Sequence, residues 1–287
     1  MVWYIFSFLN AFFESLKDVY GKKGLKVVDE YVVAWSWSFF TLPFLIPIVL
    51  FTGIPNLGNQ FWLALLVGGG LNVPATILYM KAIKLSDLSI TIPMITFTPL
   101  FLLLTSPLIV GEFPSSVALI GIFLIVFGSY VLNLNKRQKG YLYPFQALLK
   151  EPGPKLMLLV AFIWSITANF DKVGVLNSSA LFWVLAANAF ISAAMFPIVL
   201  VASRKSIKQI SKSLNYLVPL GFFAAVSLVF QMIAIGMTLV AYVISIKRTS
   251  AIMSVLFGHF IFKEKGLKER LLGTIIMIIG VLLITLS

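Results

Sequence analysis

The sequence predicts an all-α membrane protein whose ten transmembrane helices form two inverted five-helix repeats. Of the 287 residues, 60% are hydrophobic and only 11% are charged, which is more apolar surface than a soluble core can bury. At ~20 apolar residues per span, the chain has room for about ten helices. The two halves also resemble each other in sequence, and an odd number of spans per half inverts the second half relative to the first.

The expected spans are the apolar stretches between charged and Pro/Gly-rich segments. The N-terminal stretch lacks a basic leader and an obvious cleavage site, so we expect it to be the first span. Residues 135–154 form the one long connection. They separate a first repeat at 1–134 from a second at 155–287. The ten spans are expected at 2–20, 31–52, 60–82, 88–110, 116–134, 155–174, 179–203, 216–237, 239–262 and 268–287.

The internal repeat is clearest in a glutamate and two glycines that recur 152 positions later: Glu112, Gly121 and Gly128, then Glu264, Gly273 and Gly280. Glycines seven residues apart share one face of a helix, so each half is predicted to offer a surface for close helix packing. Internal repeats in an apolar chain are typical of secondary transporters. Their substrate sites lie at the repeat interface, near the bilayer midplane.

Polar stripes occur at matching places in the first span of each half. Asn10, Glu14 and Lys17 share one helix face in the first half. Polar side chains within spans are costly and usually functional, so we expect these stripes to line a cavity. The alternative is a set of interhelical hydrogen bonds that only hold the bundle together. The second-half stripe consists of Ser165, Asn169 and Lys172.

The pair Lys247 and Arg248 lies inside the ninth span, with apolar runs on both sides. A rise of about 1.5 Å per residue places the pair roughly 10–13 Å in from Val240, so both side chains should face the protein interior. One interpretation is an ion pair with Glu14 or Asp171. A second is a site for an anionic substrate, because arginine binds carboxylate and phosphate in a bidentate way. A third is coupling to a proton or counter-ion, for which the candidates are Glu14, Asp171, Lys17 and Lys172.

Aromatic and amide side chains supply the other candidate substrate contacts. Tyr79 and Gln231 occupy matching positions in the two halves, and Asn188 is the only amide in its span. For each aromatic residue, packing against lipid is the competing interpretation. The candidates are Tyr79, Gln231, Trp35, Trp164, Tyr242, Asn169 and Asn188.

Several classes of function are disfavoured by composition. The chain has no cysteine and one histidine, so we expect no disulfide, metal site or other cofactor. The formal charge of +12 is concentrated in short loops, where it sets topology, so we expect no nucleic-acid partner. A membrane enzyme acting on a lipid-linked substrate would need clustered carboxylates, and the acidic residues are scattered. A structural subunit with a sealed core would not require buried charges.

These features resemble the drug/metabolite transporter superfamily, in particular its EamA-type members: ten spans, two repeats, and a glutamate followed by spaced glycines in each half. The resemblance implies a transporter, not an enzyme, that works by alternating access without ATP. The expected substrate is a small organic anion or zwitterion, such as an amino acid or a phosphorylated or carboxylated metabolite. The Lys247–Arg248 pair also resembles the phosphate-binding pair of the sugar-phosphate and nucleotide-sugar branch. We expect a monomer or dimer in a prokaryotic inner membrane, with protons or a counter-substrate as candidate coupling partners.

Basic residues predict the orientation of the chain. Apart from Lys172, Lys247 and Arg248, every Lys and Arg lies in or beside an odd-numbered loop. The positive-inside rule then places these loops in the cytoplasm and both termini outside. The family pattern implied by the resemblance puts both termini inside. For this chain we favour the orientation given by its charges.

Overall fold

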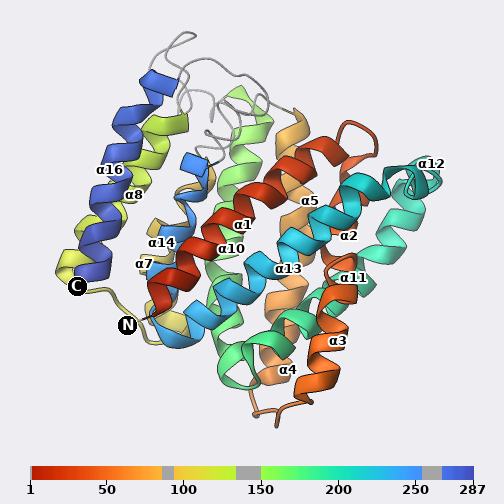
Figure 1. Ribbon diagram of the computed structural model, residues 1–287, viewed down its shortest axis with the longest axis horizontal. Coiled ribbons are helices and arrows are strands. Elements are labelled where there is room, and N and C mark those ends of the chain that lie inside the picture. The colour runs from red at the N-terminus through yellow and green to blue at the C-terminus, as the bar shows by residue number, and fades with distance from the viewer. Residues whose placement is uncertain (1, 86–93, 134–149, 254–266) are drawn as a thin grey trace.

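The computed structural model describes residues 2–85, 94–133, 150–253 and 267–287, and every regular element among them is a helix (Figure 1). The predicted all-α class is therefore confirmed. Five helical stretches are long and apolar enough to cross a membrane: Glu30–Thr52, Phe61–Ala82, Pro152–Leu176, Ala180–Ala202 and Ser211–Met237. The elements are α1 (Trp3–Gly24), α2 (Glu30–Phe39), α3 (Leu42–Thr52), α4 (Phe61–Ala64), the π-helical turn η1 (Leu65–Gly69), α5 (Gly70–Leu85), α7 (Thr98–Ile109), α8 (Ser116–Asn133), α10 (Pro152–Leu176), α11 (Ala180–Ala202), α12 (Arg204–Ile207), the 3₁₀ turn η2 (Ser211–Ser213), α13 (Leu214–Met237), α14 (Val240–Lys247) and α16 (Leu267–Leu286).

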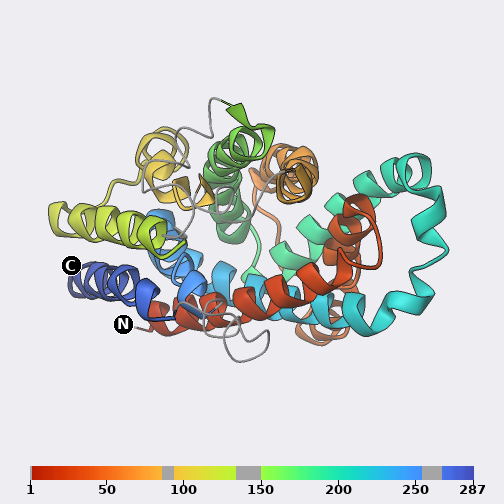
Figure 2. The same cartoon turned by 90° about the horizontal axis from the view of Figure 1, so that it is seen from above.

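The bundle has two distinct ends. We call one the terminal end, because α1 begins there and α16 ends there (Figure 1). It also holds the turns at 53–60, 110–115, 177–179 and 238–239. The opposite end holds most of the lysines and arginines of the described chain, and we call it the basic end. Helix α10 runs between them through the middle of the bundle, where it packs against α5, α7, α11 and α13 (Figures 1 and 2).

Side-chain caps start two helices at matching places in the repeats. The Asp29 carboxylate accepts a hydrogen bond from Val32 N at 3.0 Å and caps α2. The Ser179 hydroxyl accepts one from Phe182 N at 3.3 Å and caps α11. Such caps satisfy backbone donors that a helix leaves free at its first turn. The two repeats thus begin their second spans in the same way.

The repeated glycines bring α8 and α16 into contact at one side of the bundle (Figure 2). A Cβ atom added to Gly121 would lie 2.6 Å from the carbonyl oxygen of Gly280. One added to Gly128 would lie 2.7 Å from the carbonyl oxygen of Gly273. The two backbones therefore touch, which confirms the close packing predicted from the glycine spacing. The helices are antiparallel, so each glycine of one repeat meets a glycine of the other.

The span predicted at 31–52 matches the apolar stretch Glu30–Thr52, but its helix is interrupted, because α2 ends at Phe39 and α3 begins at Leu42. Pro43 stands in the first turn of α3. A proline there has no N–H to donate to the carbonyl four residues earlier, and its ring clashes with that carbonyl. At the break, the Thr41 hydroxyl contacts the carbonyl oxygens of Trp37 at 2.8 Å and Gly221 at 3.2 Å. The break is thus held against α13.

The spans predicted at 88–110 and 239–262 are also interrupted, at positions that match in the repeat. The first is interrupted at residues 96–97, just before α7, and the second at 248–249, just after α14. Pro99 accounts for the first interruption, because it cannot donate to the carbonyl of Ile95. The second contains no proline. There the backbone forms 3₁₀-type hydrogen bonds to the carbonyl three residues earlier, from Arg248 N to Ser245 O at 3.0 Å and from Thr249 N to Ile246 O at 2.9 Å.

Some predicted features lie outside the described residues. They are the N-terminal parts of the fourth span, the C-terminal part of the ninth, Glu264, and most of the predicted connection at 135–154.

Candidate functional site

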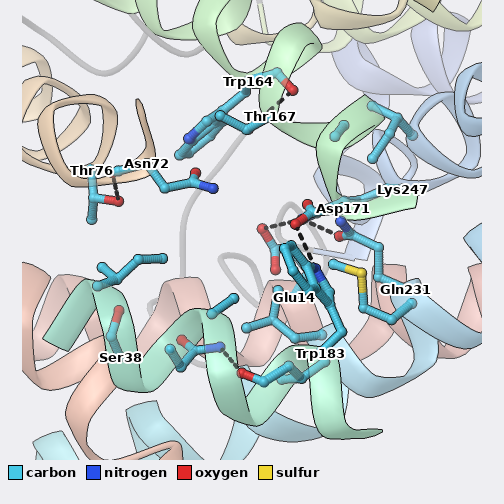
Figure 3. A pocket seen from close by; sticks show the side chains of 18 of the residues that line it. Glu14, Ser38, Asn72, Thr76, Trp164, Thr167, Asp171, Trp183, Gln231 and Lys247 are labelled. Carbon is cyan, nitrogen blue, oxygen red and sulfur yellow. Dashed lines mark hydrogen bonds and ion pairs between the residues drawn. The ribbon is translucent and has the colours of Figure 1, made fainter. Parts of the chain in front are cut away.

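A cavity of about 110 Å³ lies between the two halves, beside the interrupted helices (Figure 3). Helices of both repeats contribute to its wall. Charged side chains gather at one end of the cavity, and Ser38, Asn72 and Thr76 lie at the other (Figure 3). The polar and aromatic lining residues are Glu14, Trp37, Ser38, Asn72, Thr76, Thr98, Trp164, Thr167, Asp171, Trp183, Asn188, Gln231, Lys247 and Arg248.

Glu14 is the centre of the charged cluster. Lys17 is on the same face of α1 and places its ammonium 2.7 Å from Glu14 Oε1. Lys247 lies 3.3 Å from the same oxygen, so the predicted ion pair between Lys247 and Glu14 is present. Lys247 also donates to Gln231 Oε1 at 2.8 Å, and Ser227 donates to Glu14 Oε2 at 3.1 Å. The carboxylate of Glu14 therefore has two cations and a hydroxyl as partners.

Arg248 has a different environment, although it is the next residue. Its Nη2 donates to the Thr98 hydroxyl at 2.8 Å, and that hydroxyl in turn donates to the Ile95 carbonyl left free by Pro99. Its Nε is buried without a hydrogen-bond partner. No described carboxylate lies within 4.0 Å of the guanidinium. A cation inside a membrane protein usually has an anionic partner, so this side chain is poised to bind one.

Asp171 is the second charged side chain in the wall that forms no ion pair within the described part of the chain. One of its oxygens accepts a hydrogen bond from Trp183 Nε1 at 2.9 Å. None of the described basic residues forms an ion pair with it. The Trp183 ring is almost fully buried and lies flat against Gly174, where an added Cβ would be 2.2 Å from the ring. Only glycine allows the indole to approach α10 so closely, and this contact fixes the donor beside Asp171.

The structure brings most of the predicted site residues together. Tyr79 is close to the wall, because its ring packs against Trp164 with 5.1 Å between centroids and 34° between the ring planes. Lys17 also borders the site, with its ammonium 3.8 Å from the centre of the Trp37 ring. The predicted residues that line the cavity itself are Glu14, Trp164, Asp171, Asn188, Gln231, Lys247 and Arg248.

Three predicted substrate contacts point elsewhere. Trp35 stacks on the ring of Phe39, with 4.3 Å between centroids. The Tyr242 hydroxyl accepts a hydrogen bond from Ser115 N at 3.3 Å at the terminal end. Asn169 donates to Thr105 Oγ1 at 3.1 Å and so joins α10 to α7. All three contact other protein groups, and none is among the cavity-lining residues.

Lys172 forms an ion pair outside the cavity, at the terminal end. Its ammonium contacts Glu112 and also donates to the carbonyl oxygen of Thr238 at 2.9 Å. The other oxygen of Glu112 accepts from Val240 N at 3.0 Å. Because α14 has no side-chain cap of its own, Glu112 caps it from the other repeat. This group, Glu112, Lys172, Thr238 and Val240, is called the terminal lock below.

Several lining residues were not predicted from the sequence. Asn72 and Thr76 lie one turn apart beside the glycines of their span, and this polar spacing could have identified them. Thr98 follows an interruption that Pro99 signals. Trp183 has no comparable signal, because its role depends on the approach of α11 to Gly174.

Apolar spans, two related halves and a polar cavity between them define a multi-pass membrane transporter. The sequence matches the EamA-like transporter family over residues 1–134 and 152–286, so the chain belongs to this family. The resemblance inferred from the repeat is thereby confirmed. A solved crystal structure of a protein superposes with a TM-score of 0.79 at 17% identity, covering 98% of this chain and 96% of the other, and supports the fold alone. A comparison with curated protein sequences gives no match.

Proposed function

We propose that this protein is a secondary transporter that moves a small organic anion or zwitterion by alternating access, with the cavity as its substrate site. The observation that carries the proposal is Arg248. Its guanidinium faces the cavity with one hydroxyl partner, a free Nε and no described counter-ion. A planar guanidinium with an N–H donor still free can bind a carboxylate or a phosphate through paired hydrogen bonds.

The size of the cavity favours a small substrate. An apolar cavity of about 150 Å³ holds benzene, and the space here is about 110 Å³. An amino acid or a short carboxylated or phosphorylated metabolite is closer to this size than a nucleotide sugar. The rings of Trp37 and Trp164, which meet edge to face with centroids 6.5 Å apart, suit the apolar part of such a molecule.

The terminal lock supports alternating access. It joins α10 to turns from both repeats, and Asn177 adds bonds from Gly58 N at 2.9 Å and Gln60 N at 3.3 Å. These contacts hold the terminal end together and would have to break before substrate could pass there. By the positive-inside rule, the basic end faces the cytoplasm of a prokaryotic cell. Uptake of a proton or of a counter-substrate at the Glu14 cluster would drive the cycle.

The test is a thermal-stability screen of the purified protein with amino acids, short carboxylates and phosphorylated metabolites. Arg248→Gln is compared with Arg204→Gln, which removes an exposed arginine at the basic end. We expect at least one class of ligand to stabilise the wild type and Arg204→Gln but not Arg248→Gln. Equal stabilisation of all three proteins would contradict the proposal. Uptake of the same ligand into proteoliposomes, lost only in Arg248→Gln, then establishes transport.

A further inference from the structure

Two side chains of opposite charge line the cavity and form no ion pair with another described residue. Arg248 contacts the hydroxyl of Thr98, and Asp171 contacts the indole of Trp183. They are not paired with each other, since neither occurs in an ion pair among the described residues. A charge in this position is costly until an opposite charge approaches it. Arg248 could therefore pair with an anion, and Asp171 with a cation, supplied from outside the described chain.

The remaining charges of the site already have partners. Glu14 and Lys247 form an ion pair at 3.3 Å, and Lys17 adds a second cation to Glu14 at 2.7 Å. The Lys247 ammonium lies in the same cluster as Asp171 but is held by Glu14 and Gln231 (Figure 3). Glu14 is therefore occupied by the protein itself, whereas Asp171 remains open to a cation from outside.

The charges that line the cavity also balance in the described chain. Glu14 and Asp171 are acidic, and Lys247 and Arg248 are basic. Lys17, which borders the site, is balanced by Asp18, whose carboxylate lies 3.4 Å from its ammonium. A substrate with a net negative charge would satisfy Arg248 and leave the wall unbalanced. A zwitterion satisfies both open side chains and keeps the site neutral, which matters in a region of low dielectric constant.

Asp171 is held in a fixed orientation for this role. The Trp183 indole donates to one carboxylate oxygen at 2.9 Å. The ring is itself fixed by Gly174 on one side and by the Phe61 ring, 5.8 Å away at 87°, on another. A carboxylate with one oxygen tied in this way presents its remaining acceptor sites to the cavity. Pre-organisation of this kind lowers the cost of binding.

We infer that Asp171 is a second binding subsite, which takes the ammonium group of a zwitterionic substrate while Arg248 takes its carboxylate. Trp183 is a positioning residue for this subsite. The inference rests on the proposed function and narrows it from organic anions and zwitterions to amino-acid-like zwitterions.

The experiment compares ligand pairs that differ by one ammonium group. L-Alanine is paired with propanoate, L-leucine with 4-methylpentanoate and L-phenylalanine with 3-phenylpropanoate. Dissociation constants are measured by thermal shift for the wild type, Asp171→Asn and Arg248→Gln. Asparagine keeps an acceptor for the Trp183 N–H, so the variant removes the charge and not the hydrogen bond.

In the wild type we expect at least one amino acid to bind tenfold or more tightly than its deaminated partner, as one charge-assisted hydrogen bond would give. Asp171→Asn should lose this preference and keep its affinity for the acid, which also shows that it is folded. Arg248→Gln should bind neither compound of the pair. Trp183→Phe keeps the ring but not the donor, and should weaken the preference without abolishing it.

The failures of the two proposals have different signatures. If the acids bind the wild type through Arg248 and the amino acids bind no better, the subsite is refuted and the proposed function stands. Retention of the amino-acid preference in Asp171→Asn likewise refutes the subsite. If neither compound of any pair binds the wild type, the subsite for amino-acid-like zwitterions is refuted. Binding to Arg248→Gln with wild-type affinity refutes the anion site itself.

Discussion

Replacement of Gly128 by alanine tests the contact between α8 and α16. The added Cβ would lie 2.7 Å from the carbonyl oxygen of Gly273 and 2.8 Å from Met277 N. Both are backbone atoms, so no side chain can rotate away. Ordinary contact begins near 3.4 Å, and the helices would therefore have to separate by roughly 0.7 Å at this point.

Two opposing effects set the magnitude. Overpacking of a close contact costs about 1–3 kcal/mol. Alanine in place of glycine stabilises a helix by about 1 kcal/mol through its higher propensity. The second effect is isolated by Gly70→Ala in α5, where an added Cβ meets no atom within 4 Å. The difference between the two variants is thus the clash alone, about 1–3 kcal/mol of unfolding free energy.

The assay is thermal unfolding in detergent, with helix content followed by circular dichroism. Gly70→Ala should unfold at or slightly above the wild-type temperature, and Gly128→Ala several degrees below Gly70→Ala. Met277→Ala in the Gly128→Ala background should recover little, because the backbone of α16 remains in place. If Gly128→Ala is as stable as Gly70→Ala, the two backbones are not in contact and the reasoning is refuted.

Three further variants test the site and the terminal lock. Glu112→Ala removes the partner of the Lys172 ammonium and the cap of α14, and should lower the unfolding free energy by about 1–3 kcal/mol; an unchanged melting temperature would argue against the lock. Thr98→Val removes the hydroxyl that holds the Arg248 guanidinium and should weaken ligand binding several-fold, so an unaltered dissociation constant would count against this role. Trp37→Phe should slow proteoliposome uptake while Trp35→Phe leaves it near wild type, and equal rates for the two would show that the cavity wall is misassigned.

The composition and the repeat were sufficient to predict the class of the fold and the contact of the repeated glycines. These signals are local or periodic: apolar length, helical spacing and recurrence at a constant offset. The inward orientation of Lys247 and Arg248 could also be inferred, because a cation within an apolar span is costly when it faces lipid. Glu14 was predicted as one of two possible ion-pair partners for the Lys247–Arg248 pair, the other being Asp171.

The remaining features depend on how helices are placed relative to each other. Residues two apart on a helix point in nearly opposite directions, so only one of Trp35 and Trp37 can face the cavity. Which one does so is decided by the packing of α2 against its neighbours. The interruption after α14 could not be predicted from a proline, because the sequence has none there, whereas Pro99 marks the matching interruption in the first repeat. Trp183 reaches Asp171 only because Gly174 admits its ring.

The glycine contacts have a special place in the symmetry that relates the repeats. Gly121 matches Gly273 in the repeat, and Gly280 matches Gly128. A rotation that exchanges the halves would therefore place the Gly121–Gly280 contact on the Gly128–Gly273 contact. The contact between α8 and α16, called the seam below, is thus mapped onto itself. The same rotation does not map the terminal lock onto itself. Lys172 pairs with Glu112, whereas the matching residue of the first repeat, Lys17, pairs with Glu14. If the halves exchange conformations during transport, the seam stays the same in both states while the lysine pairings change. The α8–α16 seam would then be the stationary reference against which every other displacement in the cycle can be measured.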